Sequence, residues 1–145
     1  VHNREDWERE DWTAGVIALV SRLPYFRWFD SGDMYSLQLA HKMYDVMKNC
    51  KNTKFWLPTR MHKFNKFSYI INRMQKLPNV VVRKSGDGVR GEVIRGRNVS
   101  TIFDPQTQAA PKGAQVCPAY QNDGKCGDCR ACWDRKVRNV TYRRH

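Results

Sequence analysis

The order of apolar patterns along the chain predicts an α/β fold. Segments with helical spacing alternate with short β-rich runs, in the order α-β-α-β-α-β with one further strand after them. This alternation is typical of parallel βαβ units, whose right-handed crossovers lay the helices over the sheet. We therefore expect a small parallel sheet of three or four strands, open or a partial barrel, flanked by helices. So few strands cannot close an eight-stranded barrel.

Three stretches have apolar residues at the three- and four-residue spacing of a helix. They cover residues 3–23, 34–50 and 64–77, and a proline directly follows the first and the third. Proline cannot continue a helix, so these two helices are expected to end there. His41 falls on the apolar stripe of the second stretch, and we expect it to belong to the core rather than to bind a ligand.

The predicted strands are rich in aromatic and β-branched side chains. They are residues 25–29, 54–57, 80–83 and 100–103. The glycine-rich stretch 86–98 is expected to be a long loop, and residues 106–113 are the best linker candidate. This order predicts an α/β core over residues 1–104. Residues 105–145 are expected to pack on it as an irregular cysteine segment with a basic tail, the whole forming a single compact domain.

Four of the five cysteines lie in one stretch near the C-terminus, with the spacing C-x8-C-x2-C-x2-C. They are Cys117, Cys126, Cys129 and Cys132. Thiolates are soft donors, and four that converge hold zinc or an iron–sulfur cluster. A tight triplet with a remote fourth cysteine favours a [4Fe–4S] cluster, because each thiolate then reaches a different iron. Structural zinc sites more often use two separated C-x2-C pairs, so zinc is the alternative, and a redox dithiol or chance clustering is the remaining one.

The cysteine segment also carries an expectation about folding. Residues 105–145 contain few large aliphatic side chains, so binding of the metal would supply much of that segment's folding free energy. The fifth cysteine, Cys50, ends a helical stripe and is expected to be a small buried hydrophobe.

Polar and charged residues follow three of the predicted strands. In open α/β sheets, ligands bind at the carboxyl ends of the strands. Asp33, Arg60 and Lys84 stand at these ends and together would suit a phosphate or carboxylate group. The competing interpretation is that such residues cap the following helices and shape the turns.

Lysine and arginine exceed aspartate and glutamate by twelve charges. A positive excess of this size suits nucleic acid or an acidic redox partner protein, although a solvated basic surface gives the same composition. The C-terminal stretch 135–145 is interpreted in the same two ways. No apolar run approaches the ~20 residues of a membrane helix, and clustered cysteines without a disulfide pattern indicate a reducing, intracellular compartment. The first residue is Val1, so we expect a processed product or part of a longer protein.

Three blocks of the sequence support a family resemblance. They are residues 26–33 (FRWFDSGD), 54–60 (KFWLPTR) and 126–133 (CGDCRACW). With these blocks the chain resembles a family of small, poorly characterised phage-encoded proteins with a cysteine motif. Its members look like partial-barrel α/β proteins and are distantly similar to radical-SAM enzymes. The resemblance implies that Cys117, Cys126, Cys129 and Cys132 bind a metal or cluster in the host cytoplasm.

The sequence departs from the radical-SAM pattern in one respect. Those enzymes carry C-x3-C-x2-C in the loop after the first strand, and three ligands leave one iron open. Here that loop, residues 30–33, holds no cysteine, and a fourth ligand at Cys117 would close the cluster. Radical-SAM catalysis is therefore not expected.

Three functions follow from these patterns. The first is an iron–sulfur phage protein whose [4Fe–4S] cluster serves electron transfer, redox sensing or structure. The second is a nucleic-acid-binding module with a structural four-cysteine zinc site. The third is an enzyme that uses the strand-end residues Asp33, Arg60 and Lys84.

Overall fold

The computed structural model describes residues 8–29, 33–85, 98–106, 109–121 and 127–143. The expected turn at residues 30–32, most of the expected loop 86–98 and Cys126 lie outside these ranges. The described chain contains three α-helices and a six-stranded sheet. The predicted α/β class is confirmed.

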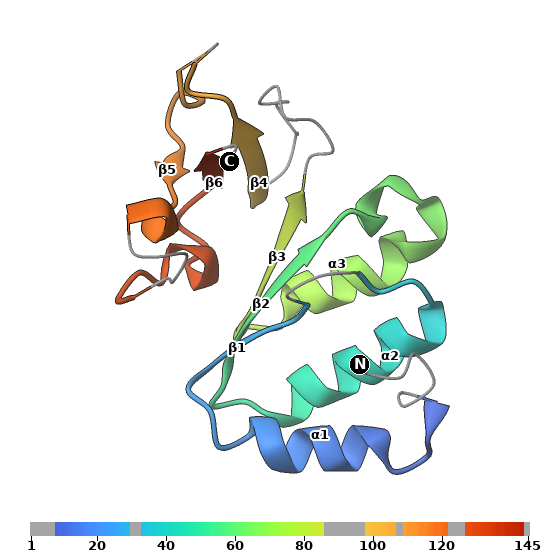
Figure 1. Ribbon diagram of the computed structural model, residues 1–145. Helices are drawn as coiled ribbons and strands as arrows, with labels where there is room; N and C mark the ends of the chain where they lie inside the picture. The colour runs from blue at the N-terminus through green and yellow to red at the C-terminus, as the bar shows by residue number, and fades with distance from the viewer. Residues whose placement is uncertain (1–7, 30–32, 86–97, 107–108, 122–126, 144–145) are drawn as a thin grey trace. The chain divides into compact units, whose positions relative to one another are not determined.

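The sheet is parallel, with the strand order β1-β2-β3-β4-β6-β5 (Figure 1). Its strands are β1 (Tyr25–Arg27), β2 (Lys54–Thr59), β3 (Val80–Ser85), β4 (Val99–Phe103), β5 (Gln115–Val116) and β6 (Asn139–Arg143). The first four match the predicted strands, but the expected number of three or four was wrong. β5 is only two residues long, and β6 lies in the stretch interpreted as a solvated basic tail. Val140 and Thr141 of β6 are both buried, and since successive residues of a strand face opposite sides, both faces of β6 are covered at this point.

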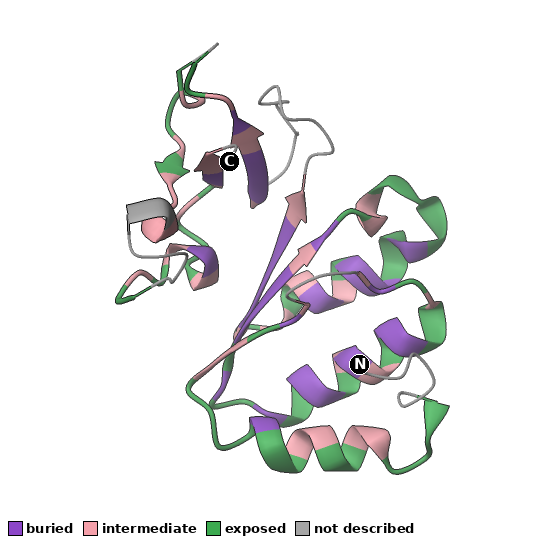
Figure 2. Ribbon diagram, in the orientation of Figure 1, coloured by how far each residue is buried: buried purple, intermediate pink, exposed green. Residues whose placement is uncertain are grey.

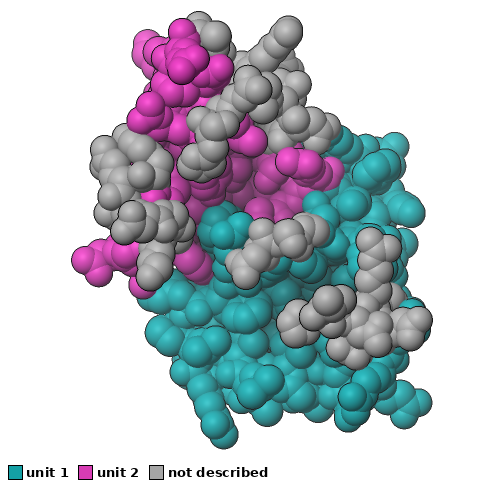
Figure 3. Space-filling model, viewed as in Figure 1, with its two compact units in different colours: residues 1–57, 61–80 teal, residues 58–60, 81–145 magenta. Residues whose placement is uncertain are grey.

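The chain forms two compact units (Figure 3). Unit 1 comprises residues 1–57 and 61–80, and unit 2 comprises residues 58–60 and 81–145. All three helices belong to unit 1, whereas β4, β5, β6 and the cysteine segment belong to unit 2. The domain boundary expected after residue 104 stays a prediction.

Unit 1 has a conventional apolar core. Helix α1 (Trp12–Val20) packs against α2 (Leu37–Asn49), which packs against α3 (Ser68–Lys76). Two short 3-10 turns, η2 (Met61–Lys63) and η3 (Asn65–Phe67), lead into α3. Figure 2 shows buried residues along one side of α2 and α3, while α1 is buried mainly at its end. Helix α2 begins after Ser36, whose hydroxyl accepts the N–H of Gln38 as an N-cap.

The buried stripe of α2 shares Ala40, Val46 and Met47 with the predicted one but does not include His41. It consists of Leu39, Ala40, Met43, Val46 and Met47. His41 is exposed, so its expected place in the core was wrong. Leu39 and Met43 complete the stripe instead, at the same three- and four-residue spacing. The larger apolar surface decides which face turns inward.

Polar side chains tie the ends of the elements of unit 1 together. The Asn79 amide donates to the carbonyls of Met47, Cys50 and Thr53 at 3.2, 3.0 and 3.0 Å. The buried Thr53 hydroxyl is 2.8 Å from the Leu23 carbonyl and 3.1 Å from that of Val20. These bonds satisfy carbonyls that the ends of α1 and α2 would otherwise leave without an intrahelical partner.

Candidate metal centre in unit 2

The strand register of unit 2 assigns its side chains to two faces. Paired residues of parallel strands project from the same face, and successive residues alternate. Ser85 pairs with Ser100, Ser100 with Val140, and Ile102 with Tyr142. Arg83, two residues before Ser85, therefore projects from the same face as Tyr142. We call this side of the unit 2 strands the Tyr142 face.

The opposite face is held by hydroxyl groups. Thr101 and Thr141 are a register pair with exposures of 2% and 0%, and their hydroxyl oxygens are 3.0 Å apart. The Thr101 hydroxyl is also 3.1 Å from the side-chain oxygen of Asn139. This contact between paired side chains agrees with the assignment of the two faces.

Arg83 anchors the cysteine segment to the Tyr142 face. Its side chain is completely buried, and its guanidinium donates five hydrogen bonds to main-chain carbonyls. The acceptors and distances are Cys132 (3.0 Å), Ala131 (2.8 Å), Asp134 (2.9 Å), Val137 (2.8 Å) and Val99 (3.4 Å). Four of the five belong to residues 131–137. The flat guanidinium fork, with its five N–H donors, is suited to such a cage.

Burial lowers the pKa of the Arg83 guanidinium by desolvation, while Cys132, Tyr142 and Asp134 act in the opposite direction. A guanidinium remains charged even so. A positive charge is therefore enclosed among neutral carbonyls, near a thiol, a phenol and the carboxylate of Asp134.

Cys132 lies on the Tyr142 face, inside the 3-10 turn η5 (Ala131–Trp133). The residue is 6% exposed, and its sulfur is 3.3 Å from the hydroxyl oxygen of Tyr142. Arg83 holds the main chain of Cys132, while Tyr142 contacts its side chain. The sulfur thus has a position fixed from two sides.

Cys117 is hydrogen-bonded to Thr141, the residue before Tyr142 in β6. Its N–H donates to the carbonyl of Thr141 at 2.8 Å, which is the last rung of the ladder between β5 and β6. Val116 pairs with Thr141, so the main chain of Cys117, the next residue, is level with Tyr142. The 3-10 turn η4 (Pro118–Gln121) starts at the next residue. Two of the predicted ligands, fifteen residues apart in the sequence, therefore border adjacent residues of β6.

The turn that carries Cys129 is also held by an arginine. Gly127 has a φ of 57°, a left-handed conformation that glycine adopts without steric cost. The exposed Arg130 side chain donates to the carbonyls of Gly127 at 2.8 Å and Cys129 at 2.9 Å. Its guanidinium also lies 5.7 Å from the centre of the Trp133 ring. The Cys129 side chain is half-buried beside this turn.

Over the residues with described positions, no group of three or more histidine, cysteine or acidic side chains converges on one point. Cys126, the fourth predicted ligand, lies outside that part of the chain. Cys50 is separate from the others. It is 3% exposed in the core of unit 1, as expected, and burial raises the pKa of its thiol.

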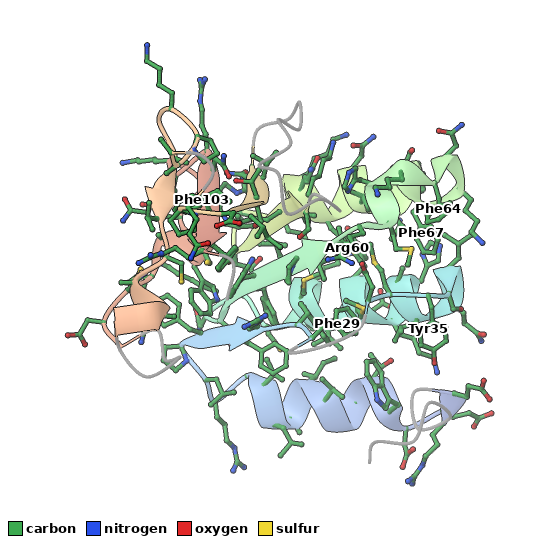
Figure 4. All side chains as sticks on the ribbon, turned by 45° about the horizontal axis from the view of Figure 1, so that its top comes forward. Phe29, Tyr35, Arg60, Phe64, Phe67 and Phe103 are labelled. Carbon is green, nitrogen blue, oxygen red and sulfur yellow. The ribbon has the colours of Figure 1, made fainter. Side chains whose placement is uncertain are left out.

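The predicted anion-binding residues are distributed over the two units. Asp33 belongs to unit 1, whereas Arg60 and Lys84 belong to unit 2. A carboxylate oxygen of Asp33 accepts the N–H of Met34 at 2.8 Å, a local bond of the kind that the turn interpretation expects. Arg60, labelled in Figure 4, is exposed, and Lys84 projects from the face opposite to Arg83. A combined site of these three residues stays a prediction.

Sequence reasoning missed Arg83 and Tyr142 as parts of the candidate centre. Arg83 was recognised only as the end of a predicted strand, and Tyr142 only as part of a basic tail. A signal for Arg83 was present, since a charged residue directly after three buried valines must find partners inside the fold. The sequence held no such signal for Tyr142, because its position depends on strand β6, which was not predicted.

The family comparison covers nearly the whole chain. A family model described as "Gene product 88" matches residues 2–135, which include all four clustered cysteines. No match was found among curated proteins or among solved structures. Of the helices whose residues are described, none has the length and apolar character needed to cross a membrane. The expected phage-type family is confirmed, while the distant similarity to radical-SAM enzymes stays an expectation. The chain belongs to the Gene product 88 family.

Proposed function

We propose that this chain binds a metal centre through Cys117, Cys126, Cys129 and Cys132, and that the centre is a [4Fe–4S] cluster. One observation carries the proposal: Cys117 and Cys132 both border neighbouring residues of β6, although they come from opposite ends of the motif. The C-x2-C-x2-C triplet supplies three closely spaced sulfurs, and the remote Cys117 completes a set of four.

The surroundings suit thiolate ligands. Cys132 is shielded from water, its sulfur lies against a hydroxyl group, and arginines 83 and 130 contact the main chain on both sides of the motif. Hydrogen bonds to sulfur, nearby charge and limited solvent access are the means by which proteins tune iron–sulfur centres. Four cysteine ligands leave no iron open to a substrate, so the proposed role is electron transfer, redox sensing or structure. An acidic redox partner would suit the basic chain.

Anaerobic purification with metal analysis and a visible spectrum tests this proposal. We expect a brown protein with about four irons per chain and absorption near ~400 nm. Serine substitution of Cys126, Cys129 or Cys132 should remove most of the iron. Cys50→Ala is the matched control, because Cys50 is buried in unit 1, and this variant should keep its iron. A colourless protein with stoichiometric zinc would contradict the cluster and favour the alternative metal.

The second candidate function is a nucleic-acid-binding module in which zinc only stabilises the fold. It is favoured by the turns before α3, where exposed Lys63 and Lys66 stand on either side of Phe64 in the sequence, and Phe64, labelled in Figure 4, is exposed as well. Basic residues beside an aromatic ring bind single strands by charge attraction and stacking. Binding of a labelled single-stranded oligonucleotide should weaken steeply with salt and with Phe64→Ala. Absence of binding at low salt would contradict this candidate.

A further inference from the structure

The Arg83 guanidinium is buried without a direct ion pair among the described residues, although the Asp134 carboxylate stabilises its charge without bonding to it. A buried cation normally has a negatively charged partner, because burial removes the solvation that stabilised its charge. Each of the five hydrogen bonds of the Arg83 guanidinium ends instead on a neutral carbonyl oxygen. Arg83 is 0% exposed, so water does not solvate its charge either.

The carbonyl cage lies directly against one of the proposed ligands. One acceptor is the carbonyl of Cys132 itself, at 3.0 Å from the Arg83 Nε. Two others, Ala131 and Asp134, stand one and two residues from it. A set of thiolates on a metal carries net negative charge, and at short range within a protein such a charge interacts strongly with a buried cation.

We propose that Arg83 is the built-in counter-charge of the four-cysteine centre. Its fixed positive charge offsets the negative charge of the metal-bound thiolates, and its carbonyl cage holds the Cys132 end of the motif at the distance where this is effective. The inference rests on the proposed function and adds a residue that contacts the main chain of a ligand without being one.

The alternative is that Arg83 only ties the segment to the strands. Charge and hydrogen-bonding capacity can be separated by substitution. Arg83→Lys keeps the positive charge but loses the five-donor fork, whereas Arg83→Met and Arg83→Gln lose the charge. Arg130→Met is the matched control, because Arg130 also donates to two carbonyls of the motif but is exposed to solvent, which screens its charge.

The test is the midpoint reduction potential of the cluster in anaerobically purified variants. Removing a buried positive charge makes it harder to add an electron, so Arg83→Met and Arg83→Gln should shift the potential to more negative values. Arg83→Lys and Arg130→Met should stay close to the wild type. If the wild-type chain holds zinc, the same comparison uses zinc affinity, with roughly tenfold weaker binding expected for the neutral variants alone.

Two outcomes would contradict the proposal that Arg83 is the counter-charge of the centre. One is a neutral variant whose potential equals that of the wild type. The other is Arg83→Lys with a potential shifted by as much as the neutral variants. Should both neutral variants fail to fold, Arg83→Lys decides alone, because the proposal requires its potential to stay near the wild-type value. A wild-type chain that takes up neither iron nor zinc contradicts the proposed function itself, which is a different result.

Discussion

Units 1 and 2 bury their polar groups in different ways. In unit 1 the hub of the buried hydrogen bonds is a neutral amide, Asn79, which satisfies three carbonyls beside an apolar core. In unit 2 the side chain with the most buried hydrogen bonds is the charged Arg83, which donates to five carbonyls. A neutral hub needs no further partner, whereas a buried charge does. This difference agrees with our proposal of an anionic metal centre in unit 2.

The largest loss of stability is expected in the apolar core of unit 1. Phe55 is completely buried, and its ring stacks on Trp28 with centroids 6.1 Å apart. We expect Phe55→Ala to lower the free energy of unfolding by about 3–5 kcal/mol, because it leaves a cavity in the core of unit 1. Urea denaturation with amide hydrogen exchange measures this loss and locates it.

The control for Phe55→Ala is Leu19→Ala, since Leu19 is 71% exposed and its truncation should change stability by less than about 0.5 kcal/mol. Loss of exchange protection in unit 2 ahead of unit 1 would contradict the separate character of the two units.

A smaller loss of stability is expected when the Asn79 amide is removed. Asn79→Ala leaves three carbonyls without their partner, and should cost about 1–3 kcal/mol. Asn49→Ala provides the comparison, because the exposed Asn49 amide makes one bond, to the Asp45 carbonyl of its own helix. Thermal unfolding followed by circular dichroism checks both. Equal effects of the two substitutions would show that the three bonds of Asn79 contribute no more to stability than the single bond of Asn49.

The smallest effect concerns the reactivity of single thiols. Burial raises the pKa of the Cys50 thiol, so it stays protonated at pH values where an ordinary thiol ionises. We expect iodoacetamide to modify the half-buried Cys129 of metal-free protein well before Cys50, as followed by mass spectrometry. Comparable rates for the two thiols would contradict this order.

The raised pKa of the Cys50 thiol also makes the stability of unit 1 depend on pH. The folded-state pKa of Cys50 lies above its unfolded value, so its contribution to the stability of unit 1 is complete below the ordinary thiol range. That contribution is lost as the pH rises through the raised pKa, because unfolding lets the thiol ionise. Cys50→Ala should remove this part of the alkaline dependence.

The two units also differ in how far they could be predicted. The helices were predicted from periodicity, and the strands β1, β2, β3 and β4 from their runs of aromatic and β-branched residues. The stripe of α2 was predicted correctly at Ala40, Val46 and Met47 but wrongly at His41, because similar spacing also fits Leu39 and Met43. In unit 2, β5 is too short to give a pattern, and the basic residues around β6 hide its alternation.

The four cysteines were recognised by spacing alone, and the family model covers them. The arrangement around them was not predictable in the same way. Arg83 finds its partners among main-chain carbonyls of residues 99–137, and any residue type supplies a carbonyl. Side-chain patterns therefore hold no information about the cage, which depends on the register of β3, β4 and β6.

X-ray absorption at the metal edge of anaerobically purified protein tests the central claim most directly, because it identifies both the metal and its ligands. The proposed centre predicts an iron edge with a shell of sulfur neighbours at about 2.3 Å and a second shell of iron. A shell made only of nitrogen and oxygen neighbours, or a metal content unaffected by substitution of Cys126, Cys129 and Cys132, would contradict a four-cysteine centre in unit 2.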